Sequence, residues 1–143
     1  MTIRITRLSP DVPMPAYATP GAAAFDLAAS AEVVVPPHAI ALVPTGLVVE
    51  VPSGHFLAIL ARSSTPLKRG LMVANGMGVV DSDYCGPADE VKIQVINVTH
   101  QPVHVAVGDR LAQGMVLAAP RVTFEAVAMS DKASRGGFGS TGR

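Results

Sequence analysis

Prolines and glycines interrupt this sequence so often that a long helix has no room to form. The chain holds 12 prolines and 13 glycines among 143 residues, and they are scattered along its whole length. Both residue types disfavour helix interiors, and no window of about eleven residues carries an apolar stripe with helical spacing. The chain therefore has to build its core mainly from β-strands.

Short runs rich in Val, Ile and Leu alternate with turn residues through most of the chain. Besides an alternating N-terminal strand at 3–8, we expect strands at 32–35, 40–43, 47–51, 56–60, 90–98, 103–107, 111–117 and 122–127. Within 90–98, Val91, Ile93 and Val95 form an apolar row toward a core, and we expect the mixed opposite row to face another subunit. Many short strands separated by turns predict an all-β fold: a β-sandwich, jelly roll or barrel.

One short helix is expected from Thr65 to Arg69. Thr65 can cap this turn with its hydroxyl, Pro66 suits the first helical position and Gly70 suits the exit. We expect a β-structured core over residues 1–129. Apart from Phe138, residues 130–143 are small or polar and can bury little surface, so they predict a flexible C-terminal arm.

Charge is scarce and balanced in this chain. Only 15% of the residues are charged, against about 25% in an average soluble domain, which favours self-association. The 11 basic and 11 acidic residues cancel, so we expect no nucleic-acid partner that depends on a broad positive field.

Cys85 has no second cysteine to pair with, and the uncharged run 33–49 is too short and too rich in proline to cross a bilayer. We therefore expect a cytoplasmic protein with no membrane partner.

The end of the chain has the composition of a phosphate clamp. Its glycines allow successive N–H groups to converge on an anion, and guanidinium and hydroxyl donors lie among them. A phenylalanine among glycines has no core to join, so a flat nucleobase would explain it. The residues concerned are Arg135, Phe138, Gly139, Ser140 and Thr141. The alternative is a disordered glycine-rich end.

The segment 75–84 is a second candidate site. Glycines flank a polar and aromatic set, which predicts a hairpin whose backbone approaches a ligand closely. Asp81 is a candidate general base, because a carboxylate can orient and deprotonate a water when cations stabilise the developing charge. The alternative is that Asp81 and Asp83 are ordinary turn residues.

Three further segments carry weaker signals. Residues 62–64, before the expected helical turn, combine a guanidinium with two hydroxyls that suit an anion, although a solvated loop is the simpler interpretation. In the turn 108–113, a structural pair of Asp109 and Arg110 is the simpler interpretation. Asp26, among apolar neighbours, needs a partner if buried and is either structural or close to a metal. The histidines, at 38, 55, 100 and 104, have no metal-site spacing, and no nearby base activates Cys85.

Taken in chain order, these segments resemble the five motifs of the trimeric dUTPase family, over nearly the whole chain. The resemblance implies a jelly-roll subunit, a homotrimer with active sites shared between subunits, and a C-terminal arm that closes over a neighbour's site. It also implies hydrolysis of dUTP to dUMP and pyrophosphate, which supplies the precursor of dTMP and limits uracil in DNA. A dCTP deaminase-like enzyme and a nucleotide-gated regulatory binding module on the same fold remain the alternatives.

The resemblance assigns a role to each matching residue. Asp81 would position the attacking water, Tyr84 would pack under the deoxyribose, and Asn75 with the backbone of Val79 and Val80 would read uracil. The phosphate contacts would be Arg62, Ser63, Ser64 and Gln113, with Lys92 as a neighbour, and Phe138 would stack on the base beside Gly139. The γ-phosphate contacts would be Arg135, Ser140 and Thr141.

The same resemblance implies Mg²⁺ held by triphosphate oxygens and water, with no direct protein ligand and with Asp26 as a candidate outer-sphere contact. Two departures from the family pattern bear on these roles. Arg135 lies only three residues before Phe138, so Lys132 is an alternative, and 87–89 looks like an insertion ahead of Lys92.

Overall fold

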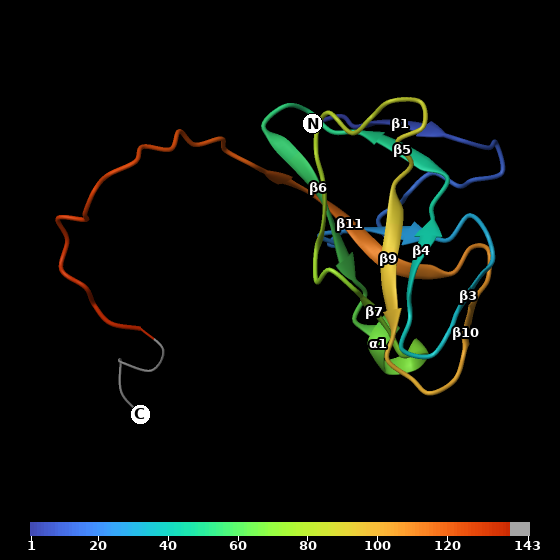
Figure 1. Ribbon diagram of the computed structural model, residues 1–143. Helices are drawn as coiled ribbons and strands as arrows, with labels where there is room; N and C mark the ends of the chain where they lie inside the picture. The colour runs from blue at the N-terminus through green and yellow to red at the C-terminus, as the bar shows by residue number, and fades with distance from the viewer. Residues whose placement is uncertain (138–143) are drawn as a thin grey trace.

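The computed structural model describes residues 1–137 (Figure 1). Within these residues, eleven strands and one helix follow in chain order: β1 (Arg4–Arg7), β2 (Phe25–Ala28), β3 (Val33–Val35), β4 (Ile40–Pro44), β5 (Leu47–Glu50), β6 (His55–Ala61), α1 (Ser64–Arg69), β7 (Leu71–Val73), β8 (Gly78–Val80), β9 (Lys92–Asn97), β10 (Val103–Val105) and β11 (Arg110–Ala118). The prediction of an all-β chain with at most one short helix is confirmed for the part that the structure describes. None of its helices is long and apolar enough to cross a membrane.

The strands form antiparallel sheets around a single apolar core. One sheet has the order β2-β11-β6-β8 and another the order β4-β9-β7, while β1 pairs with β5 and β3 with β10. Fully buried residues come from both larger sheets, such as Leu27, Leu57 and Leu111 from the first and Ile93 from the second. These side chains belong to one contact cluster, so the sheets face each other across a shared interior.

Strand β9 confirms the alternation seen in the sequence. Val91, Ile93 and Val95 are buried, as the apolar row requires. On the other face, Ile96 lies opposite Ile40 of β4 and Met72 of β7, and the last two are exposed. That another subunit meets this face stays a prediction.

Helix α1 lies where the sequence indicates, but Thr65 does not cap it. The helix begins at Ser64, and the buried Thr65 donates its hydroxyl to the carbonyl oxygen of Leu111 at 2.8 Å. The capping prediction is wrong because a hydrogen bond to β11, 46 residues away, takes the hydroxyl inward. The exit at Gly70 is confirmed: its φ of 63° is the left-handed conformation that glycine adopts without strain.

The strand predicted at 122–127 is wrong. After β11 the described chain runs away from the body without regular structure (Figure 1), and Val122 and Phe124 are 69% and 92% exposed. A strand needs a partner to satisfy its backbone groups, and no strand in the described part of the chain pairs with this segment. Strands β2, β7 and β8 were not predicted as strands.

Candidate active site

A carboxylate and two arginines meet where β2, β11 and β6 lie side by side. Asp26 of β2 is 2.8 Å from Nε of Arg62, through Oδ1, and 2.9 Å from Nη1 of Arg110, through Oδ2. Arg62 follows the last residue of β6, and Arg110 opens β11. The strand order therefore collects, at one end of the sheet, three charges that are far apart in the sequence.

The other predicted phosphate contacts lie at this same end. Gln113 pairs with both Asp26 and Leu60, and its amide donates to the carbonyl oxygen of Ala61 at 3.1 Å. Ser63 is exposed at the start of α1 and makes no side-chain capping bond, and Ser64 is the first helical residue. The structure thus brings Arg62, Ser63, Ser64 and Gln113 together, and we call this group the arginine end of β6.

Asp81 lies at the opposite end of β6. It follows β8, in which Val80 pairs with Leu57, so Asp81 comes level with the start of β6. Asp81 is exposed and lines a polar cavity of about 290 Å³ with His55, Asp83 and Arg121. We call this the aspartate end of β6.

The two ends are well separated within one chain. Along a strand each residue advances by about 3.3 Å, and the six steps from Phe56, level with Asp81, to Arg62 span about 20 Å. A nucleotide phosphate cannot contact Arg62 and receive a water held by Asp81 across that distance. In a single chain, these two predicted functional groups do not come together.

The predicted base and sugar contacts surround β8. Asn75 lies in the exposed turn before β8, and Val79 is exposed while Val80 is buried. Tyr84 is exposed, and its hydroxyl donates to the carbonyl oxygen of Glu90 at 3.3 Å. The hairpin predicted at 75–84 is wrong, because β8 pairs with β6 whereas β7 pairs with β9 in the other sheet.

Four further predictions have different outcomes. Lys92 opens β9 in the other sheet, and its Nζ lies 3.8 Å from Oε2 of Glu90, so its phosphate role stays a prediction. The extra residues before it form a turn in which the Asp89 carboxylate accepts the N–H of Gly86 at 2.7 Å. Arg135 is exposed on the segment that runs away from the body. The predicted contacts Phe138, Gly139, Ser140 and Thr141 lie outside the described residues.

The predicted pair of Asp109 and Arg110 is wrong. Asp109 accepts a hydrogen bond from Arg69 at 2.5 Å and another from the N–H of Ala106 at 2.8 Å. The Arg69 guanidinium lowers the pKa of the Asp109 carboxyl below its ordinary 3.8, more than burial raises it. Arg110 instead reaches Asp26, because neighbouring side chains of an extended chain point in opposite directions.

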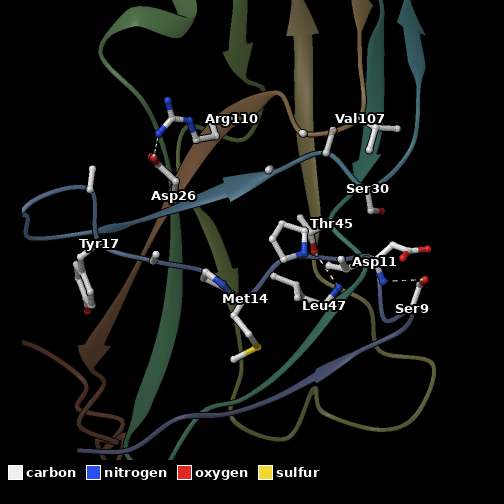
Figure 2. Close-up of a pocket in the computed structure, with 18 residues that line it drawn as sticks. Ser9, Asp11, Met14, Tyr17, Asp26, Ser30, Thr45, Leu47, Val107 and Arg110 are labelled. Atoms are coloured by element: carbon white, nitrogen blue, oxygen red, sulfur yellow. Dashed lines mark hydrogen bonds and ion pairs between the residues drawn. The ribbon is translucent and has the colours of Figure 1, made fainter.

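Sequence reasoning also missed a cavity beside the arginine end. It has a volume of about 470 Å³, and apolar residues of the segment 12–18 line much of it. Figure 2 shows Asp26 and Arg110 joined across its upper edge, with Tyr17 and Met14 below them. No local pattern in 12–18 signals this wall, which forms only where the segment crosses β2.

Candidate metal ligands lie mostly apart from one another in residues 1–137. No three His, Cys, Asp or Glu side chains gather there, and His38 and His100 face each other with ring nitrogens 3.1 Å apart. Both carboxylate oxygens of Asp26 are engaged by arginines. A metal ion that enters with a phosphate ligand would leave these contacts intact.

The fold is a β-sandwich in which Asp26, Arg62 and Arg110 gather at one end of a sheet. Comparison with known sequences narrows this class: the chain belongs to the dUTPase family, whose model matches residues 10–142. It is 40% identical over 144 residues to the deoxyuridine 5'-triphosphate nucleotidohydrolase of Helicobacter pylori strain J99, covering 99% of this chain and 97% of that one. It is 44% identical over 138 residues to the protein of that name from Caulobacter vibrioides strain NA1000, covering 92% and 87%.

Solved structures agree with this family. The dUTPase of Streptococcus mutans superposes with a TM-score of 0.78 at 29% identity, covering 87% of this chain and all of that one. The dUTPase of Staphylococcus bacteriophage 80alpha, solved with dUPNHPP, superposes with a TM-score of 0.86 at 21% identity, covering 99% and 98%. The predicted dUTPase-like jelly-roll fold is confirmed.

Proposed function

We propose that this chain hydrolyses dUTP to dUMP and pyrophosphate, with Mg²⁺, as a homotrimer whose active sites are shared between copies. The observation that carries the shared site is the separation of Asp81 from Arg62 by about 20 Å along β6. A second copy that presents its aspartate end to the first copy's arginine end would unite the two groups. Membership of the dUTPase family supports the choice of reaction.

In this proposal Asp81 orients a water against the α-phosphorus of the nucleotide. The water oxygen forms a bond to that phosphorus, its proton passes to the Asp81 carboxylate, and the bond to the oxygen bridging the α- and β-phosphorus breaks. Pyrophosphate leaves with the bonding electrons. Arg62, Ser63, Ser64 and Gln113 hold the phosphates in line and stabilise the charge that develops on the leaving group.

Base and sugar selection is proposed for the residues around β8. Asn75 and the backbone of Val79 and Val80 would read the uracil edge. Tyr84 would lie under the deoxyribose, where a ribose 2′-hydroxyl would clash. The hydrogen bond from the Tyr84 hydroxyl to Glu90 supports this role, because it limits the freedom of an otherwise exposed ring.

The remaining proposals concern the arm, the metal ion and the location. We assign residues 130–143 to an arm over a neighbour's site, with Phe138 on uracil beside Gly139, and Arg135, Ser140 and Thr141 on the γ-phosphate. The described part of this arm extends away from its own body, which leaves it accessible to another copy (Figure 1).

Mg²⁺ bound to the triphosphate would neutralise charge on the leaving group, with Asp26 at most in its outer sphere. We propose a cytoplasmic location, where dUTP arises.

Substrate specificity gives the first test. Pyrophosphate release is measured in parallel on dUTP, dTTP, dCTP and UTP, each with and without Mg²⁺, and we expect rapid release from dUTP with Mg²⁺ alone. Ammonia release from dCTP would instead indicate a deaminase. Binding of dUTP without turnover would indicate a regulatory module.

Mixing two inactive variants tests the shared site. Asp81→Asn retains the arginine end and Arg62→Ala retains the aspartate end, so a mixed trimer can unite two intact halves. When equal amounts are unfolded and refolded together, random assembly gives both intact halves at about a quarter of the interfaces. We expect about a quarter of the wild-type turnover from the mixture and almost none from either variant refolded alone. If trimers that are shown to contain both variants recover no turnover, Asp81 and Arg62 act in a site within one chain.

A further inference from the structure

Asp26 holds two arginines that approach it from different strands. Its side chain is 17% exposed, and each carboxylate oxygen faces a different guanidinium, at 2.8 Å for Arg62 and 2.9 Å for Arg110. Arg62 also donates from Nη1 to the carbonyl oxygen of Arg110 at 3.2 Å. One carboxylate therefore fixes the positions of two guanidinium groups relative to each other.

A bulge in β11 turns Arg110 toward this carboxylate. Arg110 pairs with Ala28 and Ala112 pairs with Leu27, so two steps on β11 match one step on β2. Bulges of this kind redirect a side chain at a sheet end and are common beside active sites. Without the extra residue, Arg110 would not occupy its place opposite Arg62 across Asp26.

Two arginines and one aspartate leave a net positive charge that solvent can reach. The Arg62 side chain is 27% exposed and that of Arg110 is 56% exposed. The carboxylate of Asp26 contacts Nε of Arg62 and Nη1 of Arg110. Within residues 1–137, Nη2 of neither arginine forms a hydrogen bond. Planar guanidinium groups bind phosphate oxygens in pairs of hydrogen bonds, so a fixed arginine pair suits a polyphosphate.

We propose that Asp26 is a positioning residue that holds Arg62 and Arg110 as one paired anion-binding unit for the triphosphate. Arg110 then contacts phosphate directly, in addition to the residues assigned above. The identity of the triphosphate rests on the proposed function. An arginine pair held in this way should also bind inorganic pyrophosphate, whichever nucleotide is the substrate. Pyrophosphate is therefore the probe that tests this unit without any turnover.

Replacing Asp26 with asparagine separates positioning from simple charge. If Asp26 acted only as a nearby negative charge, Asp26→Asn would raise the local charge and tighten pyrophosphate binding. If it positions the arginines, the same change releases both guanidinium groups and weakens binding. If it acts through the metal ion, binding weakens only when Mg²⁺ is present. The three roles differ in sign or in metal dependence.

The experiment measures pyrophosphate affinity by titration calorimetry on the full chain, with EDTA and then with Mg²⁺. We expect Asp26→Asn to weaken binding about tenfold in EDTA, the effect of misplacing one charge-assisted contact. The matched control is Glu50→Gln, which removes a carboxylate from the exposed pair with Arg4 and should leave the affinity unchanged. Tighter or unchanged binding by Asp26→Asn in EDTA, or weakening confined to Mg²⁺, would overturn the proposal.

Arg110→Lys gives a second test should Asp26→Asn fail to fold. It keeps the charge of a largely exposed side chain but loses the planar fork, and we expect about fivefold weaker pyrophosphate binding. Unchanged affinity would remove Arg110 from the unit. With dUTP, both variants should raise KM more than they lower kcat. A wild-type chain that binds pyrophosphate through this unit but leaves dUTP intact would refute the proposed hydrolysis and not the positioning role.

Discussion

The two ends of β6 differ in how many contacts a single chain supplies to the predicted functional residues there. At the arginine end, Asp26 joins two arginines from different strands, and Gln113 and Thr65 tie β11 to β6 and α1. At the aspartate end, Asp81 follows a strand of three residues and lies exposed beside an open polar cavity. The arginine end is organised by contacts within the chain, whereas Asp81 at the aspartate end is exposed. Under the proposed function, phosphate binding is built in and the attack on phosphorus depends on assembly.

The largest effect is expected from Asp81→Asn. The amide can still hydrogen-bond a water but cannot take its proton, so kcat should fall by about a thousandfold. The Kd for dUTP should change little, because the arginine end is untouched. Single-turnover kinetics and calorimetric titration with dUTP measure the two quantities separately.

Asp83→Asn is the matched control for Asp81→Asn, since Asp83 is an exposed carboxylate on the same cavity. It should keep kcat within about twofold. Equal losses in the two variants would show that the negative charge of the turn matters rather than one base. An Asp81→Asn enzyme with normal kcat would remove Asp81 from the mechanism.

Gly114→Ala tests the packing that underlies the arginine end. A Cβ at this position would lie 2.5 Å from the ring of Phe25 and 3.1 Å from Leu57, so β2 and β11 would have to separate. Overpacking of this kind costs about 1–3 kcal/mol of unfolding free energy. Urea denaturation at one fixed protein concentration measures it, since the proposed assembly would make stability concentration-dependent.

Gly21→Ala serves as the control for that substitution. No heavy atom lies within 4 Å of a Cβ built at Gly21, so its unfolding free energy should stay within about 1 kcal/mol of the wild type. If Gly114→Ala is equally harmless, the close contact of β2 with β11 does not determine the geometry of the arginine end.

The sequence predicted those features that depend on local alternation and turn chemistry. The buried row of β9 and the glycine exit of α1 depend on spacing along a few residues. The partnership of Asp26 with Arg110, 84 residues apart, depends on strand order and on a bulge that no local pattern encodes. The segment 122–127 shows the reverse case, because its alternating pattern is present but no strand within residues 1–137 pairs with it.

Tyr84→Ala is expected to have a smaller effect, on specificity. Removing the ring opens space for a 2′-hydroxyl, so the ratio of kcat/KM for dUTP over UTP should fall about tenfold. Tyr84→Phe keeps the ring and loses only the hydrogen bond to Glu90, and should preserve most of the ratio. Parallel steady-state assays on both nucleotides measure this. A ratio unaltered in Tyr84→Ala would exclude contact with the sugar.

The smallest effect is expected from Asp109→Asn, beside the arginine end. Arg69 lowers the pKa of the Asp109 carboxyl below 3.8, so the ionised pair stabilises the fold above that pH. Because the pair is partly exposed, the variant should lose less than about 1 kcal/mol at pH 7. The difference from wild type should stay constant down to about pH 5 and shrink as the pH falls through the lowered pKa. Urea denaturation of both proteins across this range checks the sign, and a difference that grows toward acid would contradict the assigned pair.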